Sequence, residues 1–136
     1  MKTSKTENAN RSTQRRTQRW GAVTVEFAIV APLIFLFFLG GLEMMALNFA
    51  RQTAGNASYE AARTMIIPGR TTAQAQAEGM RLMNLSGVGN GASVSITSTT
   101  TSVTATVSVP AANVSLGLTR FSSGLTLKQS CTLTKE

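Results

Sequence analysis

The segment GAVTVEFAIVAPLIFLFFLGGL, residues 21–42, decides how the rest of this sequence is interpreted. It is apolar throughout except for one carboxylate, Glu26, and it carries no charge over residues 27–42. A helix of these 22 residues rises about 33 Å at about 1.5 Å per residue, and the core of a bilayer is about 30 Å thick. The sequence therefore predicts a single membrane-spanning helix in contact with membrane lipid.

Positive charge is concentrated before this segment. Six of the 13 basic residues precede it, against the single acid Glu7: Lys2, Lys5, Arg11, Arg15, Arg16 and Arg19. Basic residues beside an apolar helix hold that end in the cytoplasm, so Arg15, Arg16 and Arg19 predict a cytoplasmic N-terminus and a translocated C-terminal region. Direct nucleic-acid binding explains the net charge of +7 less well, because the rest of the chain lacks a basic stripe with interleaved aromatic residues.

The chain is predicted to have three parts. Residues 1–21 form a basic cytoplasmic leader, in which residues 1–19 are expected to be disordered because they have almost no apolar side chains. Residues 22–66 form a transmembrane helix with an extracytoplasmic extension, and residues 67–136 form a small α+β region. The predicted fold class is therefore α+β.

The extension of the long helix shows a helical repeat of small apolar residues. Their spacings of three or four place them on one face suited to tight packing: Leu47, Ala50, Ala54, Ala57, Ala61 and Met65. The sequence Ile67-Pro68-Gly69 is predicted to end the helix.

A second, short helix is predicted to begin at a capping residue, Thr71 or Thr72, and to run to about Leu85. Its weak apolar stripe is expected to consist of Ala73, Ala77, Met80 and Leu85. Three glycines at positions 87, 89 and 91 then predict a flexible turn.

Beyond the glycines the apolar period changes to two, which is typical of strands with one buried face. Residues 93–97 and 103–109 alternate with serine and threonine, and residues 98–102 between them predict a hairpin loop. Pro110 ends the second strand, residues 111–123 are irregular, and residues 125–133 alternate again. Three short antiparallel strands are expected to lie on one of the helices, with a Ser/Thr-rich face toward solvent.

The side chains needed for catalysis are scarce. The chain has no histidine, so zinc sites of the usual kind and Ser-His-Asp or Cys-His arrangements are excluded. The acids beyond the apolar segment, Glu43, Glu60, Glu78 and Glu136, do not suggest a catalytic pair. The single cysteine, Cys131, is expected to be a small strand residue, with a reactive or intermolecular thiol as the alternative. We therefore expect no enzyme activity, no metal and no cofactor.

Glu26 is costly inside an apolar segment and needs an explanation. It can simply reach the lipid headgroups. Alternatively, a cut between Gly21 and Ala22 leaves a new amine at Ala22, which Glu26 of a neighbouring helix can neutralise, and this pairing fixes the register of the helices. An uncleaved signal anchor also fits the length of the segment, whereas a removable secretory signal fits it poorly.

Several features in this order resemble the start of type IV prepilins, and in particular TadE-like proteins, the minor pseudopilins of the tight-adherence (Tad/Flp) pilus machinery. They are Arg15-Arg16, Gly21, Val25-Glu26-Phe27-Ala28, Pro32-Leu33, Gly40-Gly41-Leu42-Glu43 and the segment NASYEAAR at residues 56–63. The resemblance covers roughly residues 15–65, and its leader is rather long.

The resemblance implies a minor pseudopilin that takes part in the assembly of a type IVb pilus, which serves adhesion and biofilm growth. It implies that a membrane-embedded prepilin peptidase cuts between Gly21 and Ala22, and that the protein stays in or near the bacterial inner membrane. The implied partners are this peptidase, other pilins and pseudopilins, and the Tad assembly platform. The alternatives are an uncleaved single-pass anchor that presents a small periplasmic binding domain, and a secreted protein that begins after Ala46.

Overall fold

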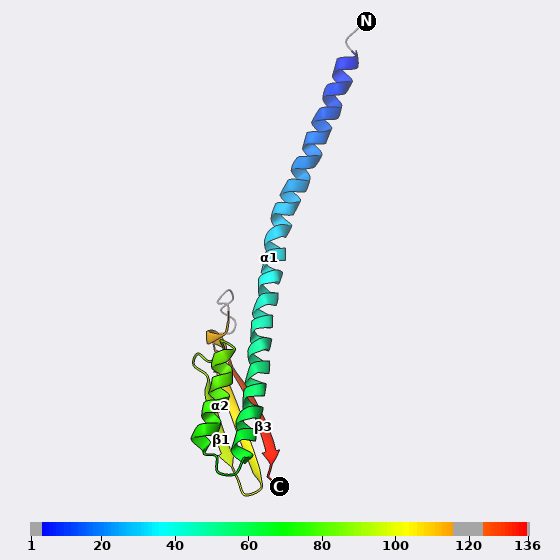
Figure 1. The fold of residues 1–136 in the computed structure, drawn as a ribbon. Helices are drawn as coiled ribbons and strands as arrows, with labels where there is room; N and C mark the ends of the chain where they lie inside the picture. Colours follow the sequence, from blue (N-terminus) through cyan, green and yellow to red (C-terminus); the bar gives the residue numbers. More distant parts are fainter. Residues whose placement is uncertain (1–3, 116–123, 136) are drawn as a thin grey trace. The chain divides into compact units, whose positions relative to one another are not determined.

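The structure is a computed structural model that describes residues 4–115 and 124–135, with side chains described from residue 21 onward. The chain divides into two compact units, Met1–Leu39 and Gly40–Glu136. A long helix, α1 (Ser4–Ile66), contributes to both units (Figure 1). In the first unit, α1 accounts for all the described residues.

The expected disorder of residues 1–19 is wrong for the described backbone, because α1 already begins at Ser4. The segment before Gly21 contains neither glycine nor proline. Extending an existing helix requires no new nucleus, and nothing in this segment interrupts the extension. Pro32 lies within α1 without ending it.

The second unit contains the rest of the fold. After α1 come α2 (Thr72–Leu85), β1 (Ser93–Ser98), β2 (Ser102–Pro110), the short 3₁₀ helix η1 (Ala111–Asn113) and β3 (Thr126–Thr134). The strands form one antiparallel sheet in the order β1-β2-β3. The α+β class, the second helix and the three-stranded antiparallel sheet are therefore confirmed.

The central strand β2 shows why the period-two pattern was informative. Its apolar side chains Val103, Ala105, Val107 and Val109 are all fully buried, and the residues between them point to the other face. On that other face the hydroxyls of Thr104 and Thr132, from neighbouring strands, lie 2.9 Å apart and hydrogen-bond. The sheet thus has one apolar face and one hydroxyl-rich face.

The core lies between the apolar face of the sheet and the two helices. Ala50, Ala54 and Ala57 of α1 pack in one cluster with Val107 and Val109 of β2. Ala61 and Ala62 form a second cluster with Val103 and Ala105. The C-terminal part of α1 and α2 lie side by side over the sheet (Figure 1). Alanine keeps α1 close to the sheet because it adds little bulk between them.

The predicted apolar stripe of α2 is wrong. Ala73, Ala77 and Leu85 are exposed and Met80 is half-buried, whereas the buried residues are Ala75, Gly79 and Met83. Gly79 explains the error, because a residue without a side chain contributes nothing to a hydrophobic pattern. A Cβ at position 79 would lie 3.2 Å from the Cβ of Ala61 and 3.3 Å from Cγ1 of Val94, so the glycine permits close packing against α1 and β1.

Local signals set the ends of α2. Thr71 is the N-cap: its hydroxyl accepts a hydrogen bond from the Gln74 amide, and the Gln74 side chain accepts one from the Thr71 amide. This reciprocal pair satisfies two amide donors at the start of the helix. Gly69 and Gly87 adopt left-handed backbone conformations, with φ of 85° and 73°, and mark the turns on either side of α2.

Candidate functional site

The apolar part of α1 in the first unit is exposed. Among the described residues, one helix is long and apolar enough to span a membrane. It lies within Gly21–Ile66, and its most apolar window has a mean hydropathy of 2.4 and no buried residue. Phe37, for example, exposes 77% of its surface. Water does not favour so large an exposed apolar surface, whereas lipid does. This helix therefore fits a single-pass membrane anchor.

The predicted cleavage site lies inside α1. Gly21 and Ala22 are both helical and exposed, and a Cβ at position 21 would meet no atom within 4 Å. The bond between them is therefore sterically accessible. A protease that needs an extended substrate must still unwind the helix locally. Glycine costs a helix roughly 1 kcal/mol relative to alanine, so Gly21 lowers the cost of unwinding here.

Glu26 lies one helical turn beyond Ala22 and is exposed. Residues four apart on a helix share a face, and side chains tilt toward the helix N-terminus. The carboxylate of Glu26 is therefore within reach of the helix start that a cut before Ala22 would create. Arg15, Arg16 and Arg19 lie on the helical backbone before this point, but their side chains are outside the described part of the chain.

The small-residue face of α1 is used within the chain. Ala50, Ala54, Ala57 and Ala61 are fully buried against the sheet and α2, while Leu47 and Met65 at the two ends are half-buried. The face is thus occupied by the chain's own second unit.

The segment at residues 56–63 divides into two faces. Ala57, Ser58, Ala61 and Ala62 are buried, and the Ser58 hydroxyl donates a hydrogen bond of 2.8 Å to the Gly55 carbonyl. The other face carries Asn56, Tyr59, Glu60 and Arg63. Packing therefore accounts for the small residues of this segment.

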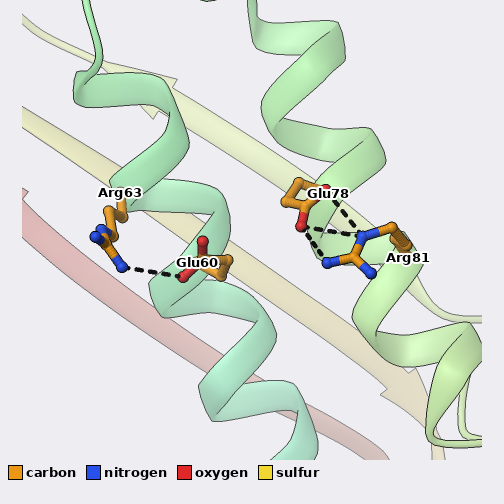
Figure 2. Close-up of polar contacts among 4 residues, drawn as sticks. All are labelled: Glu60, Arg63, Glu78 and Arg81. Carbon is orange, nitrogen blue, oxygen red and sulfur yellow. Dashed lines mark hydrogen bonds and ion pairs between the residues drawn. The ribbon is translucent and has the colours of Figure 1, made fainter.

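Two ion pairs lie on the helices that cover the sheet, one on α1 and one on α2 (Figure 2). The Glu60 and Arg63 charged groups lie 3.9 Å apart on α1, a distance that makes this a weak surface pair. On α2 the Arg81 guanidinium donates to both carboxylate oxygens of Glu78, at 2.6, 3.0 and 3.1 Å. These hydrogen bonds from Arg81 lower the pKa of Glu78 below its ordinary value and raise the pKa of Arg81.

Sequence reasoning missed the role of Glu43. This carboxylate is only 5% exposed, and the Ser115 hydroxyl donates a hydrogen bond to it. Burying a charged group is costly unless it is hydrogen-bonded, and no described buried side-chain polar atom lacks a partner. Glu43 therefore fixes the segment after η1 to α1 where the folded unit begins. The sequence feature that could have indicated this role is the position of Glu43, an acid directly after the apolar segment.

The described residues offer little else for chemistry. They contain no group of three or more histidine, cysteine, aspartate or glutamate side chains that could hold a metal ion. Cys131 is a free, half-buried thiol on β3, opposite Ala105 of β2. The site of interest is therefore the part of α1 that carries Gly21, Ala22 and Glu26, where the chemistry is that of charge pairing.

Comparison with known proteins agrees with the resemblance seen in the sequence. The family model described as TadE-like protein matches residues 21–63. Neither the curated proteins nor the solved structures contain a significant match. The matched segment carries Gly21, Glu26, Glu43 and the segment at residues 56–63, which links the chain to tight-adherence pilus systems in general. The predicted resemblance to TadE-like proteins is thereby confirmed over residues 21–63.

Proposed function

We propose that this protein is a minor pseudopilin that takes part in assembling a tight-adherence (Flp, type IVb) pilus, and that a prepilin peptidase cuts it after Gly21. The observation that supports this most is where the family match begins. It starts at Gly21 and leaves the basic leader outside. Both residues on which the proposal depends, Gly21 and Glu26, thus lie inside the match, and the basic leader lies before it.

In this proposal Glu26 acts through its charge, because its carboxylate pairs with the amine that the cut creates at Ala22. Cutting after Gly21 gives Ala22 a positively charged amine inside or beside the membrane. An amine and a carboxylate 4 Å apart attract by about 4 kcal/mol at an effective dielectric constant near 20. The amine of the same chain is one turn away and can be neutralised first. In a bundle of helices the amine of a neighbour competes for the carboxylate, and an axial slip by one turn loses this pairing between chains.

The partners follow from this role. The first unit contacts lipid and the corresponding helices of other pilins and pseudopilins in the bacterial inner membrane, with its N-terminus in the cytoplasm. The folded unit lies in the periplasm, where other pseudopilins and the Tad assembly platform are the expected partners. Because its own alanine face is already buried, contacts with these partners use the outer surfaces of the helices and the sheet.

The test of this role is an isosteric substitution, Glu26→Gln, in the full chain expressed with its pilus system. We expect normal processing, because Gly21 is unchanged, but a severe loss of co-isolation with other pilins from detergent extracts. Glu60→Gln, which removes a half-buried acid of the folded unit, is the matched control and should behave like the original chain. If Glu26→Gln assembles normally, the proposed role of this carboxylate in register is wrong.

The alternative is an uncleaved single-pass anchor that presents a small periplasmic binding domain. Two observations favour it: residues 40–136 form their own compact unit, and α1 is helical across the predicted cut. Gly21→Val separates the two functions. The pseudopilin proposal expects this variant to keep its leader and fail in assembly, whereas a simple anchor is indifferent to it.

A further inference from the structure

The sheet has two open edges in the part of the chain that the structure describes. Its strand order is β1-β2-β3, so β1 and β3 each have one neighbouring strand. β3 is nine residues long, and its sequence TLKQSCTLT contains neither glycine nor proline. Its register with β2 runs without a bulge from Thr126 to Thr134. A long and regular edge of this kind is a site where another strand can be added.

Two hydrogen bonds show which backbone groups of β3 face outward. The Ala111 amide donates to the Leu125 carbonyl at 2.9 Å, and the Lys135 amide donates to the Thr101 carbonyl at 2.8 Å. Both pairs continue the register of β2 with β3. In an antiparallel ladder, residues that bond to the partner strand alternate with residues that face away from it, so the odd-numbered residues of β3 bond to β2. The outward-facing amides and carbonyls belong to the even-numbered residues Thr126, Lys128, Ser130, Thr132 and Thr134.

The other edge, β1, is described in the same way. The Thr99 amide donates to the Ser102 carbonyl at 2.7 Å, and this pair continues the register of β1 with β2. Val94, Ile96 and Ser98 therefore direct their amides and carbonyls away from β2. Both edges thus offer backbone donors and acceptors at every second residue, and this is the chemistry that recognises an extended strand.

Apolar side chains at both edges are incompletely covered. The core-facing residues of the central strand β2 are fully buried. On β1, by contrast, Val94 and Ile96 are half-buried, and so are Leu127 and Leu133 on β3. The helices thus leave the outer part of each edge strand uncovered. A strand added at either edge would remove apolar surface from water.

Within the folded unit, α1 and β3 run in the same direction. Leu127, near the start of β3, packs against the cluster that contains Ala50 of α1. Leu133, near the end of β3, packs against the cluster that contains Ala61. Each chain enters this unit at Gly40, before both alanines. An antiparallel pair of β3 strands would place the two entry points at opposite ends of the paired sheet, whereas parallel strands place them at the same end, as a shared membrane requires.

Among parallel copies, β3 and β1 are complementary. Parallel pairing sets an outward-facing residue of one strand between two outward-facing residues of the other. Two β3 strands related by a two-fold axis along the strand would place identical residues opposite each other, and they fail this requirement. A sideways translation meets it, because Thr132 of one copy can lie between Val94 and Ile96 of the next. The apolar faces and the hydroxyl-rich faces of the two sheets then continue into each other.

We propose that β3 of one copy pairs in parallel with β1 of a second copy, so that the sheet continues from one folded unit to the next. The inference rests on the proposed function, in which copies share one membrane. It deepens that function by naming the contact between their folded units. Each copy offers both edges, so this head-to-tail contact builds an open row.

Side chains select the register of the pair. One register sets Leu133 beside Ile96 and Cys131 beside Val94, so that both apolar side chains of β1 meet apolar side chains of β3. Lys128 is the one charged residue in the sequence of β3, and β1 has none, so the pairing brings no like charges together.

The first test is disulfide trapping in membranes with the full chain, in a Cys131→Ser background. Two differently tagged copies carry Thr132→Cys and Ser95→Cys, at exposed positions that lie opposite each other in the proposed register. A disulfide requires Cα atoms within about 7 Å, so oxidation reports direct pairing. We expect a mixed dimer that is several-fold more abundant than either same-site dimer.

Ser130→Pro, added to the Thr132→Cys copy, tests the backbone contact itself. The Ser130 amide points away from β2, so proline removes no hydrogen bond from the folded unit, whereas its ring obstructs a neighbouring strand. The yield of mixed dimer should fall several-fold, and the resistance of the folded unit to proteolysis should be unchanged. Ser130→Ala keeps the amide and is the matched control, which should trap as well as the chain with serine.

Amide exchange tests the same contact without a proline. In monomers dispersed in detergent, the outward amides of Ser130 and Thr132 should exchange several-fold faster than the Gln129 amide, which bonds to β2. In membranes at high protein density, all three should exchange slowly. Outward amides that stay fast under both conditions would overturn the proposed pairing.

The trapping experiment has three further outcomes that overturn the contact. They are a predominant same-site dimer of either cysteine variant, a mixed dimer whose yield survives Ser130→Pro, and a disulfide formed with a different protein in place of the second copy. A same-site dimer of Ser130→Cys would indicate the antiparallel β3 pair.

The mass of the same chains separates the two proposals. A mixed dimer formed by chains that keep their leader leaves the contact standing and counts against the pseudopilin assignment. Correctly processed chains without a mixed dimer overturn the contact alone.

Discussion

The same helix, α1, has two kinds of surface in the two units. In residues 23–38 its large apolar side chains are exposed, as in Phe35 and Phe37, whereas in residues 50–61 the apolar residues facing the core are alanines with no exposed surface. Along α1, the exposed apolar side chains are thus the large ones and the buried apolar side chains are the small ones. Large side chains maximise contact with a fluid solvent such as lipid, and small ones let a helix approach a sheet closely. The comparison teaches that exposure of apolar area identifies a membrane segment only when side-chain size is considered with it.

The largest expected effect is on the exposed region. Phe35→Arg places a charge near the middle of the apolar segment and is expected to cost about 3 kcal/mol in membrane insertion. The measurement is the fraction of the chain that resists extraction from membranes with alkaline carbonate. Gln52→Arg, exposed on the same helix in the folded unit, should leave this fraction unchanged. If both variants lost the membrane-resistant fraction equally, the apolar segment and the folded unit would not differ in their contact with lipid.

The next effect concerns the buried region. Ala57→Leu inserts three carbon atoms between α1 and the sheet, where no surface of Ala57 is exposed. Overpacking of this kind should lower the free energy of unfolding by about 2 kcal/mol. Urea titration of the full chain in detergent, followed by limited proteolysis, measures it. Ala73→Leu, at an exposed alanine of α2, serves as the control and should have almost no effect.

A smaller effect is expected at the start of the folded unit. Glu43→Ala removes the acceptor of the Ser115 hydrogen bond and should cost about 1.5 kcal/mol. Because the bond holds the segment after η1 to α1, amide exchange should accelerate most at residues 111–115. Uniform acceleration over the sheet would show instead that Glu43 supports the whole unit, and unchanged exchange would contradict its role.

The smallest effect belongs to the exposed pair on α2. The pKa of Glu78 is lowered by the hydrogen bonds from Arg81. Stabilisation from such a group is present above the pKa of the unfolded carboxyl and is lost as the pH falls through the lower pKa of the folded one. Since the group is exposed, we expect Glu78→Gln to leave the unfolding midpoint unchanged. An NMR titration of Glu78 should show its pKa rising toward the ordinary value in Arg81→Gln.

Regular patterns in the sequence predicted much of this fold. The period-two alternation around Val103, Ala105, Val107 and Val109 marked a strand whose four apolar residues all face the core. The sequence offered Thr71 or Thr72 as the start of α2, and the structure has Thr71, which forms a capping box with Gln74. These features depend on residues close together in the sequence, so local physical rules identify them.

Features that depend on distant residues could not be predicted in this way. The buried face of α2 centres on Gly79, whose role appears only when α1 and β1 are placed against it. Glu43 bonds to a residue 72 positions away, and no spacing rule connects the two. At the candidate site, the sequence indicated Gly21 and Glu26 because one small residue and one acid stand out in an apolar run. The spacing of Ala77, Met80 and Leu85 predicts a packed stripe, but these residues lie on the side of α2 away from its buried face.

The mass of the mature chain tests the central claim most directly. The full chain should be extracted from the membranes of cells that contain an active prepilin peptidase, and its intact mass compared with that from cells with an inactive peptidase. The account predicts a chain that begins at Ala22 in the first case and the complete leader in the second. A chain that keeps Arg15, Arg16 and Arg19 in the presence of the active peptidase would contradict it.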